Sequence, residues 1–311
     1  MKKVLLILLS IFVIAALGAC ATTPAAPAAE APAAEAPAAE APAASGITVG
    51  VAMPTQSLQR WNQDGANMKA QLEAAGYTVD LQYANNDINT QLQQLENMLT
   101  KGVNALVIAS IDGSALTDVL AKAGEQGVPV IAYDRLLMNS EYVDYYATFD
   151  NWKVGTMQGE YIVEQLDLEN AAGPFNIELF TGSPDDNNAR FFFGGAMEVL
   201  QPYIDSGKLV VPSGQTDFTA VATQAWDSAV AQARMDNLIT ANYAGGAVLD
   251  AILSSNDSVA IGIVAALNNA GYGTADKPFP ILTGQDCDKA NVIAMIAGQQ
   301  NDRVFKINSG E

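Results

Sequence analysis

Histidine is absent from all 311 residues of the sequence. Its absence excludes catalytic triads built on an imidazole, metal sites with histidine ligands, and histidine as a general acid or base. Neither a Gly-rich phosphate loop nor a Walker lysine is present, which argues against a phosphorylated ligand. We therefore expect no cofactor and no metal ion.

Positive charge is also scarce. The chain has 15 Lys and Arg against 34 Asp and Glu, which gives a net charge of −19. Proteins that bind nucleic acid usually present a basic surface, so we expect no nucleic-acid partner. The acidity itself is typical of a solvated surface and says little about the ligand.

The first 19 residues have the pattern of an export signal. Two lysines precede an apolar stretch, 4–16, and the tetrapeptide Leu-Gly-Ala-Cys closes the segment at 17–20. The apolar stretch is too short to span a bilayer comfortably. The tetrapeptide resembles a bacterial lipobox, which implies cleavage before Cys20 and lipid on its sulfur; the alternative is an ordinary signal peptide with a chance cysteine. Cysteine occurs only once more, at Cys287, so lipidation of Cys20 leaves no intramolecular disulfide.

Residues 20–46 are expected to form a tether. An Ala-Pro-Ala-Ala-Glu repeat ends at Glu30, Glu35 and Glu40, and large apolar side chains are missing from this stretch. Its prolines favour extended polyproline II over helix. We therefore expect an exported protein held by lipid at the outer face of a cell membrane, either at the surface or in the periplasm.

The remaining chain alternates short apolar strands with amphipathic helices, in two series separated near Asp150 and Asn151. Strands are expected at 47–52, 79–83, 105–109, 128–133, 145–149, 175–180, 209–211, 247–253 and 279–282. In the second series, helices are expected near 153–166, 188–203, 219–241 and 257–270. Near-continuous apolar strands that alternate with helices indicate parallel sheets covered on both faces. The pattern predicts an α/β protein of two doubly wound, Rossmann-like lobes, and fits a single eight-unit barrel less well.

Polar side chains recur just after the expected strands, where open parallel sheets bind their ligands. They are Arg60, Trp61, Asp134, Arg135, Asp185, Asp186, Asn187, Asn188, Arg190, Asn256, Asp257 and Asp286, with Trp226 in a later helical stretch. Carboxylates, amides and guanidinium groups can each engage two sugar hydroxyls, and an aromatic ring can pack on the apolar face of a sugar. The pattern therefore indicates a small polar solute, with a monosaccharide as the leading candidate.

Each of these residues also has an interpretation that involves no ligand. Asp and Asn after a strand often cap the next helix, a role most expected for Asn151, Asn187 and Asp257. Arg190 could simply pair with Asp186, four residues earlier. The repetition of the same residue types at successive strand ends favours a binding site.

Several motifs together resemble those of periplasmic monosaccharide-binding proteins of the xylose-binding and multiple-sugar-binding type, the substrate-binding lipoproteins of ABC sugar transporters. They are Arg60-Trp61, Tyr133-Asp134-Arg135-Leu136, Thr148-Phe149-Asp150-Asn151, the run GSPDDNNA at 182–189, Ser255-Asn256-Asp257 and Gly284-Gln285-Asp286. The likeness extends from about Ile47 to Lys306. It implies the type I periplasmic binding protein fold, in which two lobes joined by a hinge close on the sugar.

The resemblance also implies roles for individual residues. Ligand contacts are implied for Arg60, Trp61, Asp134, Arg135, Asp186, Asn188, Arg190, Trp226, Asn256, Asp286 and Lys306. The two tryptophans would flank the sugar ring, whereas Asp286 and Lys306 would lie at hinge crossings. Residues 47–151 and 287–305 would form the N-terminal lobe and residues 152–286 the C-terminal lobe.

The chain departs from the family pattern near its end. The family continues with a helix and a strand beyond this point, so residues 306–311 are expected to be a shortened hinge and tail. A C-terminally truncated lobe would leave an apolar face and a sheet edge uncovered, which predicts lower stability than that of a full-length relative, or an inactive receptor. Cys287 replaces a small residue and is expected to be a buried, inert thiol.

The resulting function is that of a non-enzymatic, monomeric receptor that delivers a monosaccharide to an ABC importer permease. A sugar sensor that presents its closed form to a chemoreceptor or sensor kinase is the main alternative. A glycosidase using Asp134, Asp186 or Asp286 would lack a defined acid and base pair. A repressor effector domain is excluded because an export signal and a tether occupy the place of a DNA-binding motif.

Overall fold

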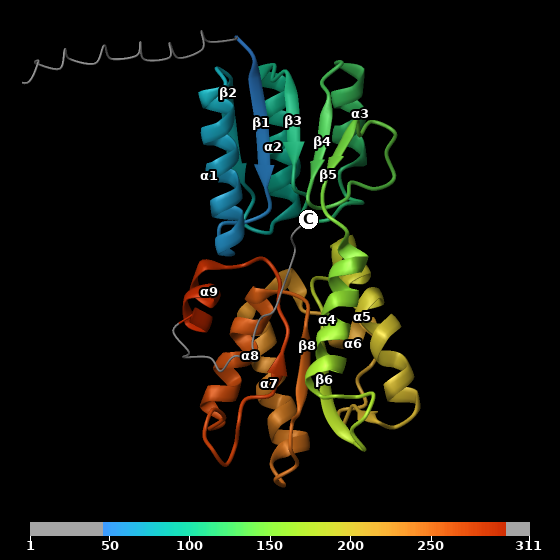
Figure 1. Cartoon of the computed structure of the whole chain (residues 1–311). Helices are drawn as coiled ribbons and strands as arrows, with labels where there is room; N and C mark the ends of the chain where they lie inside the picture. Colours follow the sequence, from blue (N-terminus) through green and yellow to red (C-terminus); the bar gives the residue numbers. More distant parts are fainter. Residues whose placement is uncertain (1–45, 297–311) are drawn as a thin grey trace, which may run out of the picture. The chain divides into compact units, whose positions relative to one another are not determined.

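The computed structural model describes residues 46–296, so Cys20 and Lys306 lie outside the described residues. The expected α/β architecture is confirmed, because two parallel sheets form and helices flank each of them (Figure 1). We call residues 46–150, which hold the first sheet, the first lobe, and residues 151–286, which hold the second sheet, the second lobe. The chain passes from one to the other between β5 and α4.

The first lobe carries a five-stranded sheet in the order β2-β1-β3-β4-β5, with every neighbouring pair parallel. Its elements are β1 (Thr48–Met53), α1 (Gln59–Ala74), β2 (Thr78–Tyr83), α2 (Ile88–Lys101), β3 (Ala105–Ile108), α3 (Thr117–Glu125), β4 (Val130–Tyr133) and β5 (Tyr145–Ala147). Successive β1 residues face opposite sides: Val51 packs in one core with Trp61, and Ala52 in another with Leu95. Burial on both faces explains why these strands are apolar without a break.

The second lobe carries a four-stranded sheet in the order β7-β6-β8-β9, also parallel. Its strands and helices are α4 (Asn151–Gln165), β6 (Phe175–Phe180), α5 (Asn187–Asp205), β7 (Leu209–Val210), α6 (Phe218–Val221), α7 (Ser228–Leu238), β8 (Ala251–Ser254), α8 (Asp257–Asn269) and β9 (Ile281–Leu282). Leu179 and Leu253 belong to the core on one face of the sheet, and Phe180 and Ile252 to the core on the other.

Helices α4 and α5 pack with their backbones in close contact. A Cβ atom on Gly155 would lie 1.9 Å from the carbonyl oxygen of Phe192. A Cβ atom on Gly195 would lie 2.1 Å from the carbonyl oxygen of Trp152. Only glycine permits this approach, which fixes the position of the α5 N-terminus beside the start of α4.

The single helix expected at 219–241 is wrong in one respect. The structure divides this stretch into α6, a 3₁₀ turn (Gln224–Trp226), α7 and a π-helical turn (Ile239–Tyr243). Ala225 and Trp226 adopt positive φ values of 56° and 57°, and the carboxylate of Asp227 then caps α7. Because a residue in the left-handed region ends a helix, this break separates Trp226 from α7.

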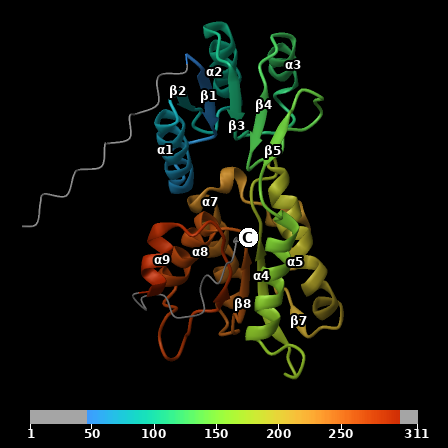
Figure 2. The same cartoon turned by 45° about the horizontal axis from the view of Figure 1, so that its top comes forward.

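The last described helix, α9 (Lys289–Ile296), begins just after β9. Both views show it beside α8 (Figures 1 and 2). The backbone amide of Asp288 donates to Oδ2 of Asp257 at 2.8 Å, and the side chain of Asn291 donates to the Asp257 carbonyl at 3.4 Å. The sequence assigned 287–305 to the N-terminal lobe, but these two contacts of its described part are with the second lobe. Among residues 46–296, no helix has both the length and the apolarity needed to cross a membrane.

Candidate functional site

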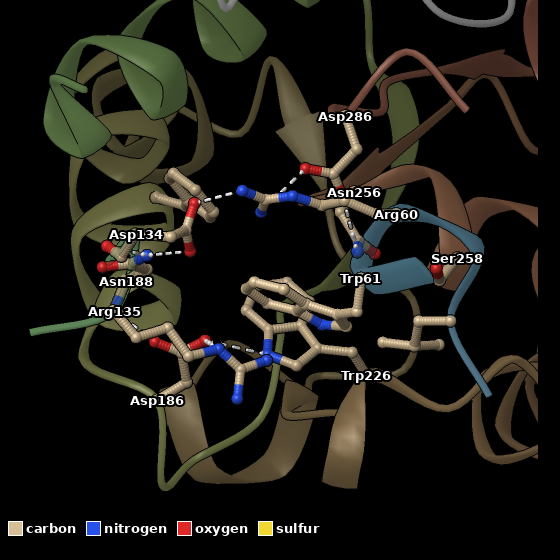
Figure 3. Close-up of a pocket in the computed structure, with 12 residues that line it drawn as sticks. Arg60, Trp61, Asp134, Arg135, Asp186, Asn188, Trp226, Asn256, Ser258 and Asp286 are labelled. Atoms are coloured by element: carbon tan, nitrogen blue, oxygen red, sulfur yellow. Dashed lines mark hydrogen bonds and ion pairs between the residues drawn. The ribbon is translucent and has the colours of Figure 1, made fainter. Parts of the chain in front are cut away.

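A polar pocket lies where the carboxyl ends of the strands from both lobes meet. It is lined by Leu58, Arg60, Trp61, Asp134, Arg135, Asp186, Asn188, Phe192, Trp226, Asn256, Ser258 and Asp286. Most of these side chains lie in the turns, or in the first turns of the helices, that follow β1, β4, β6, β8 and β9. In Figure 3 they converge from several elements on one small volume. This is the position at which open parallel sheets bind ligands.

Arg60 pairs with three carboxylates, two of which line this pocket. Its Nε lies 3.2 Å from Asp64 and its Nη1 lies 3.4 Å from Asp286, while its Nη2 donates to Asp134. Burial alone would lower the pKa of Arg60, but the charges of these carboxylates raise it above its ordinary value. The guanidinium is therefore a permanent positive charge with donors fixed toward both lobes.

Besides the contact of Arg60 with Asp286, two further polar contacts cross directly between the lobes. Nε of Arg135 lies 2.8 Å from Oδ2 of Asp186, an ion pair without hydrogen-bond alignment at that nitrogen. Asn188 donates to both the carbonyl oxygen and Oδ1 of Asp134, each at 3.2 Å. Arg135 is held from behind by the Ser110 carbonyl, which accepts from Nη1 at 2.9 Å. The two lobes thus meet through charged and amide groups that suit a polyhydroxylated ligand.

Two of the pocket carboxylates lie on strained backbone. Asp134 has φ 62° and Asp286 has φ 96°, which lie in the left-handed region. Such conformations are unfavourable for most L-residues, and at a binding site the surrounding structure must hold them in place. The hydroxyls of Tyr146 and Thr148 each donate to the Asp134 carbonyl at 3.0 Å, which fixes that turn.

Burial raises the pKa values of two pocket carboxylates. Burial raises the pKa of Asp286 to about 6, with the nearby charges of Asp134 and Asp288 adding to the effect and Arg60 opposing it. Burial also raises the pKa of Asp186, with the charge of Arg135 opposing the rise. Both carboxylates are shielded from bulk water. In such a site of low dielectric constant, hydrogen bonds to a ligand are stronger than in water.

Two indole rings form the apolar part of the pocket. Trp61 is 2% exposed and Trp226 is 4% exposed. The guanidinium carbon of Arg60 lies 4.6 Å from the centroid of the Trp61 ring. Trp226 packs edge-on against Phe192 at 6.1 Å and lies against the backbone of Gly182, where a Cβ atom would come within 2.0 Å of the ring. The rings can therefore present flat apolar faces to the C–H groups of a sugar.

Two residues that cap helices, Asp186 and Asn256, also line the pocket. The sequence favoured Asn151, Asn187 and Asp257 as caps, and this is wrong by one position, because the preceding residues cap α4, α5 and α8. Asp186 accepts from the amide of Asn188 at 3.0 Å, and Asn256 accepts from the amide of Val259 at 3.0 Å. The second polar atom of each side chain, Oδ2 of Asp186 and Nδ2 of Asn256, does not take part in capping and contacts other pocket residues.

Nine of the predicted ligand contacts line the pocket, and one described residue does not. Arg190 is exposed, and its guanidinium lies 4.3 Å from the centroid of the Phe218 ring. It therefore contacts neither the pocket nor Asp186, the pairing that the sequence offered as the alternative. Arg190 follows Asn188 by two positions on α5, and residues two apart on a helix do not share a face.

Three pocket residues were missed by the sequence analysis, namely Leu58, Phe192 and Ser258. None of the three carries a charged or amide group, the side-chain types by which the sequence indicates a sugar site. Phe192 had one available signal, because it lies four positions after Asn188 and so shares its helical face. Cys287 was expected to be buried and is instead exposed. Its neighbour Asp286 points into the pocket, and successive side chains in a turn point in different directions.

In this arrangement the lining side chains largely satisfy one another. The free space between them is about 30 Å³, which is room for only a few water molecules. Among residues 46–296, no group of three or more Cys, Asp or Glu has an arrangement that could hold a metal ion. The pocket lining consists of hydrogen-bonding side chains together with Leu58, Phe192 and the two tryptophans.

Comparison with known proteins agrees with this geometry. The family described as "periplasmic binding protein domain" matches residues 49–307. A multiple sugar-binding periplasmic protein of Azospirillum brasilense is 58% identical over 259 residues, which are 83% of this chain and 72% of that protein. The D-xylose-binding periplasmic protein of Escherichia coli is 35% identical over 260 residues, which are 84% of this chain and 73% of that protein.

A solved structure extends the comparison to three dimensions. The ABC transporter solute-binding protein of Clostridium phytofermentans, with bound β-D-glucose, is 60% identical and superposes with a TM-score of 0.78. The match covers 81% of this chain and 77% of that one. With the sequence match over most of the chain and the two-sheet architecture, this shows that the chain belongs to the periplasmic binding protein family.

Proposed function

We propose that this chain captures a monosaccharide of the xylose, glucose, galactose or arabinose type between its two lobes. The observation that carries the proposal is the convergence of carboxylate, amide and guanidinium groups from strand ends of both lobes around two indole rings. A monosaccharide presents hydroxyls in its ring plane and C–H groups on its faces, which matches this arrangement. The relatives named for multiple sugars and for xylose, and the solved relative with glucose, support the same ligand class.

Binding requires the pocket groups to exchange partners. In this structure Arg60 and Arg135 form ion pairs with carboxylates of the pocket. The free space between the side chains is too small for a sugar ring. Opening of the lobes separates Arg135 from Asp186, and closure around the sugar places hydroxyls between the same groups. Each exchanged contact remains charge-assisted, so closure loses little electrostatic energy while it encloses the ligand.

The protein is proposed to act by binding and closure alone, without chemical change of the sugar. The closed form would then deliver the monosaccharide to the permease of an ABC importer, as a monomer. A lipid on Cys20 would hold the receptor at the outer face of the membrane. Cys20→Ala tests the anchor: the parent chain should sediment with membranes, whereas the variant should be released into the soluble fraction.

Thermal unfolding with a panel of sugars tests the binding. A ligand at 100 times its dissociation constant should increase the unfolding free energy by about 2.7 kcal/mol. D-Xylose, D-glucose, D-galactose and L-arabinose form the panel, and Trp61→Ala with Asp134→Asn serve as pocket variants. We expect at least one sugar to stabilise the parent chain and neither variant to respond at the same concentration. Sugar recognition is wrong if the folded parent chain responds to no aldopentose and no aldohexose.

A further inference from the structure

A buried glutamine lies behind the pocket in the second lobe. Gln158, in α4, is 2% exposed and does not line the pocket. Its Nε2 donates to the carbonyl oxygens of Ser255 at 3.1 Å and of Gly284 at 3.2 Å. Ser255 immediately precedes Asn256, and Gly284 lies two residues before Asp286. One side-chain amide therefore joins the two turns that follow β8 and β9.

Those two turns carry pocket residues that contact each other. Nδ2 of Asn256 donates to Oδ2 of Asp286 at 3.1 Å, and the amide of Asp257 donates to the carbonyl of Gln285 at 2.9 Å. The other oxygen of Asp286 faces Arg60 of the first lobe at 3.4 Å. A shift of one turn against the other would therefore misplace both an amide and a carboxylate in the pocket.

The hydrogen bonds of Gln158 indicate the role of its side-chain amide. Both contacts use the two N–H bonds of Nε2, while Oε1 of Gln158 is buried with no partner among the described residues. An unpartnered buried acceptor is unfavourable, so packing alone does not account for a glutamine here. A methionine would fill the same space but would supply neither donor.

The first lobe contains a comparable arrangement. Gln91, in α2, is fully buried; its Nε2 donates to the Ala109 carbonyl at 3.0 Å and its Oε1 accepts from the Ile111 amide at 2.9 Å. These contacts bracket Ser110, whose carbonyl holds Arg135 in the pocket. In each lobe, a helix thus delivers a buried amide to a turn on which pocket groups depend.

We infer that Gln158 is a positioning residue for the sugar site, which holds Asn256 and Asp286 in place through the backbone of their turns. The inference rests on the proposed function, because it concerns how that same pocket is shaped. Gln158 does not touch the ligand itself. Its removal therefore weakens sugar binding without removing a contact to the sugar.

The experiment compares Gln158→Met with a matched control in the full chain. Gln94→Met is the control, because Gln94 of α2 also donates to a strand-end carbonyl, that of Tyr83 at 3.0 Å, but no residue of that turn lines the pocket. Affinity is measured calorimetrically for the sugar of the panel that binds the parent chain most tightly. We expect Gln158→Met to weaken binding by about 10- to 100-fold, as the loss of two hydrogen bonds implies, and Gln94→Met by less than about three-fold.

Coupling separates positioning from general destabilisation. In an Asn256→Ala background, one of the two groups that Gln158 orients is gone, so Gln158→Met should weaken binding by a smaller factor than it does in the parent chain. Asp286 lines the pocket and burial raises its pKa to about 6, so we expect sugar binding to have a pH midpoint near 6 that moves in Gln158→Met and stays unchanged in Gln94→Met. Gln158→Leu, which is apolar and also lacks both donors, replaces Gln158→Met if that variant does not fold.

The outcomes are distinguishable. A parent chain that binds no sugar contradicts the proposed function and this inference with it. A parent chain that binds sugar, together with a folded Gln158→Met that binds it equally well, overturns the positioning role alone. Equal losses in Gln158→Met and Gln94→Met, or a loss in the Asn256→Ala background as large as that in the parent chain, also overturn it.

Discussion

Oδ2 of Asp186 lies 2.8 Å from Nε of Arg135, so one carboxylate oxygen of the second lobe faces a guanidinium of the first. The same oxygen accepts from Nε1 of Trp226 at 3.1 Å, and the other oxygen caps α5 through the Asn188 amide. A single side chain therefore sets the lobe contact, the orientation of an aromatic ring and the start of a helix. The side chains of this ion pair are only 8% and 3% exposed.

The first prediction concerns this pair. Asn is as good a helix cap as Asp, so Asp186→Asn should keep the start of α5 but leave Arg135 buried without its counter-charge. We expect the unfolding free energy to fall by about 3 kcal/mol, measured by denaturant unfolding. Glu73→Gln, which breaks the exposed Lys69–Glu73 pair, should cost less than about 1 kcal/mol. Similar losses in the two variants would contradict the assigned role of the buried pair.

The second prediction separates Arg190 from Arg135. The structure places Arg190 over Phe218 and Arg135 in the pocket. Arg190→Ala should therefore leave sugar affinity within about three-fold and reduce stability by about 0.5–1 kcal/mol, since only an exposed cation–π contact is lost. Arg135→Ala should abolish measurable binding. The family resemblance implied a ligand contact for Arg190, and a large loss of affinity in Arg190→Ala would restore that role.

The third prediction is a dependence of stability on pH. Burial raises the pKa of Asp257 to about 8, with the charges of Asp286 and Asp288 adding to the effect. The unfolded chain releases this proton near pH 4, so between about pH 4 and pH 8 the folded state holds more protons. The unfolding free energy should therefore decrease as the pH rises through this window. The raised pKa of Asp286 acts with the same sign up to about pH 6.

Asp257→Asn tests the pH effect directly. Asn keeps an oxygen that can accept from the Asp288 amide, but it carries no charge to bury. We expect the variant to be more stable than the parent by about 1–3 kcal/mol at pH 8 and equal to it at pH 4, measured by unfolding across the range. The residual slope between pH 4 and pH 6 should remain, since Asp286 is unchanged. A variant that is destabilised equally at every pH would contradict the burial of a charge.

The fourth prediction concerns the contact of α4 with α5. An added methyl at Gly195 would meet the Trp152 backbone oxygen at 2.1 Å, and backbone cannot move aside as a flexible side chain can. Gly195→Ala should therefore lower the unfolding free energy by about 2 kcal/mol despite the higher helix propensity of Ala. Gly245→Ala is the control, because no atom lies within 4 Å of the added methyl, and its effect should stay within about 0.5 kcal/mol. Equal stability of the two variants would show that the helices can separate without cost.

Much of the pocket was predictable from the sequence. Runs such as Thr48–Met53 and Phe175–Phe180 have the continuous apolar pattern of strands buried on both faces, and the ligand side of a parallel sheet is always its carboxyl edge. Asp134 and Asn256 follow such runs directly, so their place was fixed by local pattern and topology together.

Other features depended on contacts between segments distant in sequence. Trp226 reaches the pocket because positive φ values at Ala225 and Trp226 break a helix that periodicity predicted as continuous, and Gly182 leaves room for its ring. Arg190 has the same chemistry as Arg135, yet its helical phase turns it toward Phe218. Periodicity gives the face of a helix but not the rotation of that helix against a sheet, which depends on packing such as that between Gly195 and Trp152.

The sequence by itself determined the fold class and the kinds of groups in the site, because hydrophobic period and residue chemistry are local properties. Only the tertiary structure decided that Asp186 both caps a helix and pairs with Arg135 across the lobes. The same holds for Gln158, because its side-chain amide can join the turns after β8 and β9 only when these strands lie side by side. These relationships join atoms of residues from about 50 to more than 120 positions apart, and only the tertiary packing within and between the lobes brings them within hydrogen-bond distance.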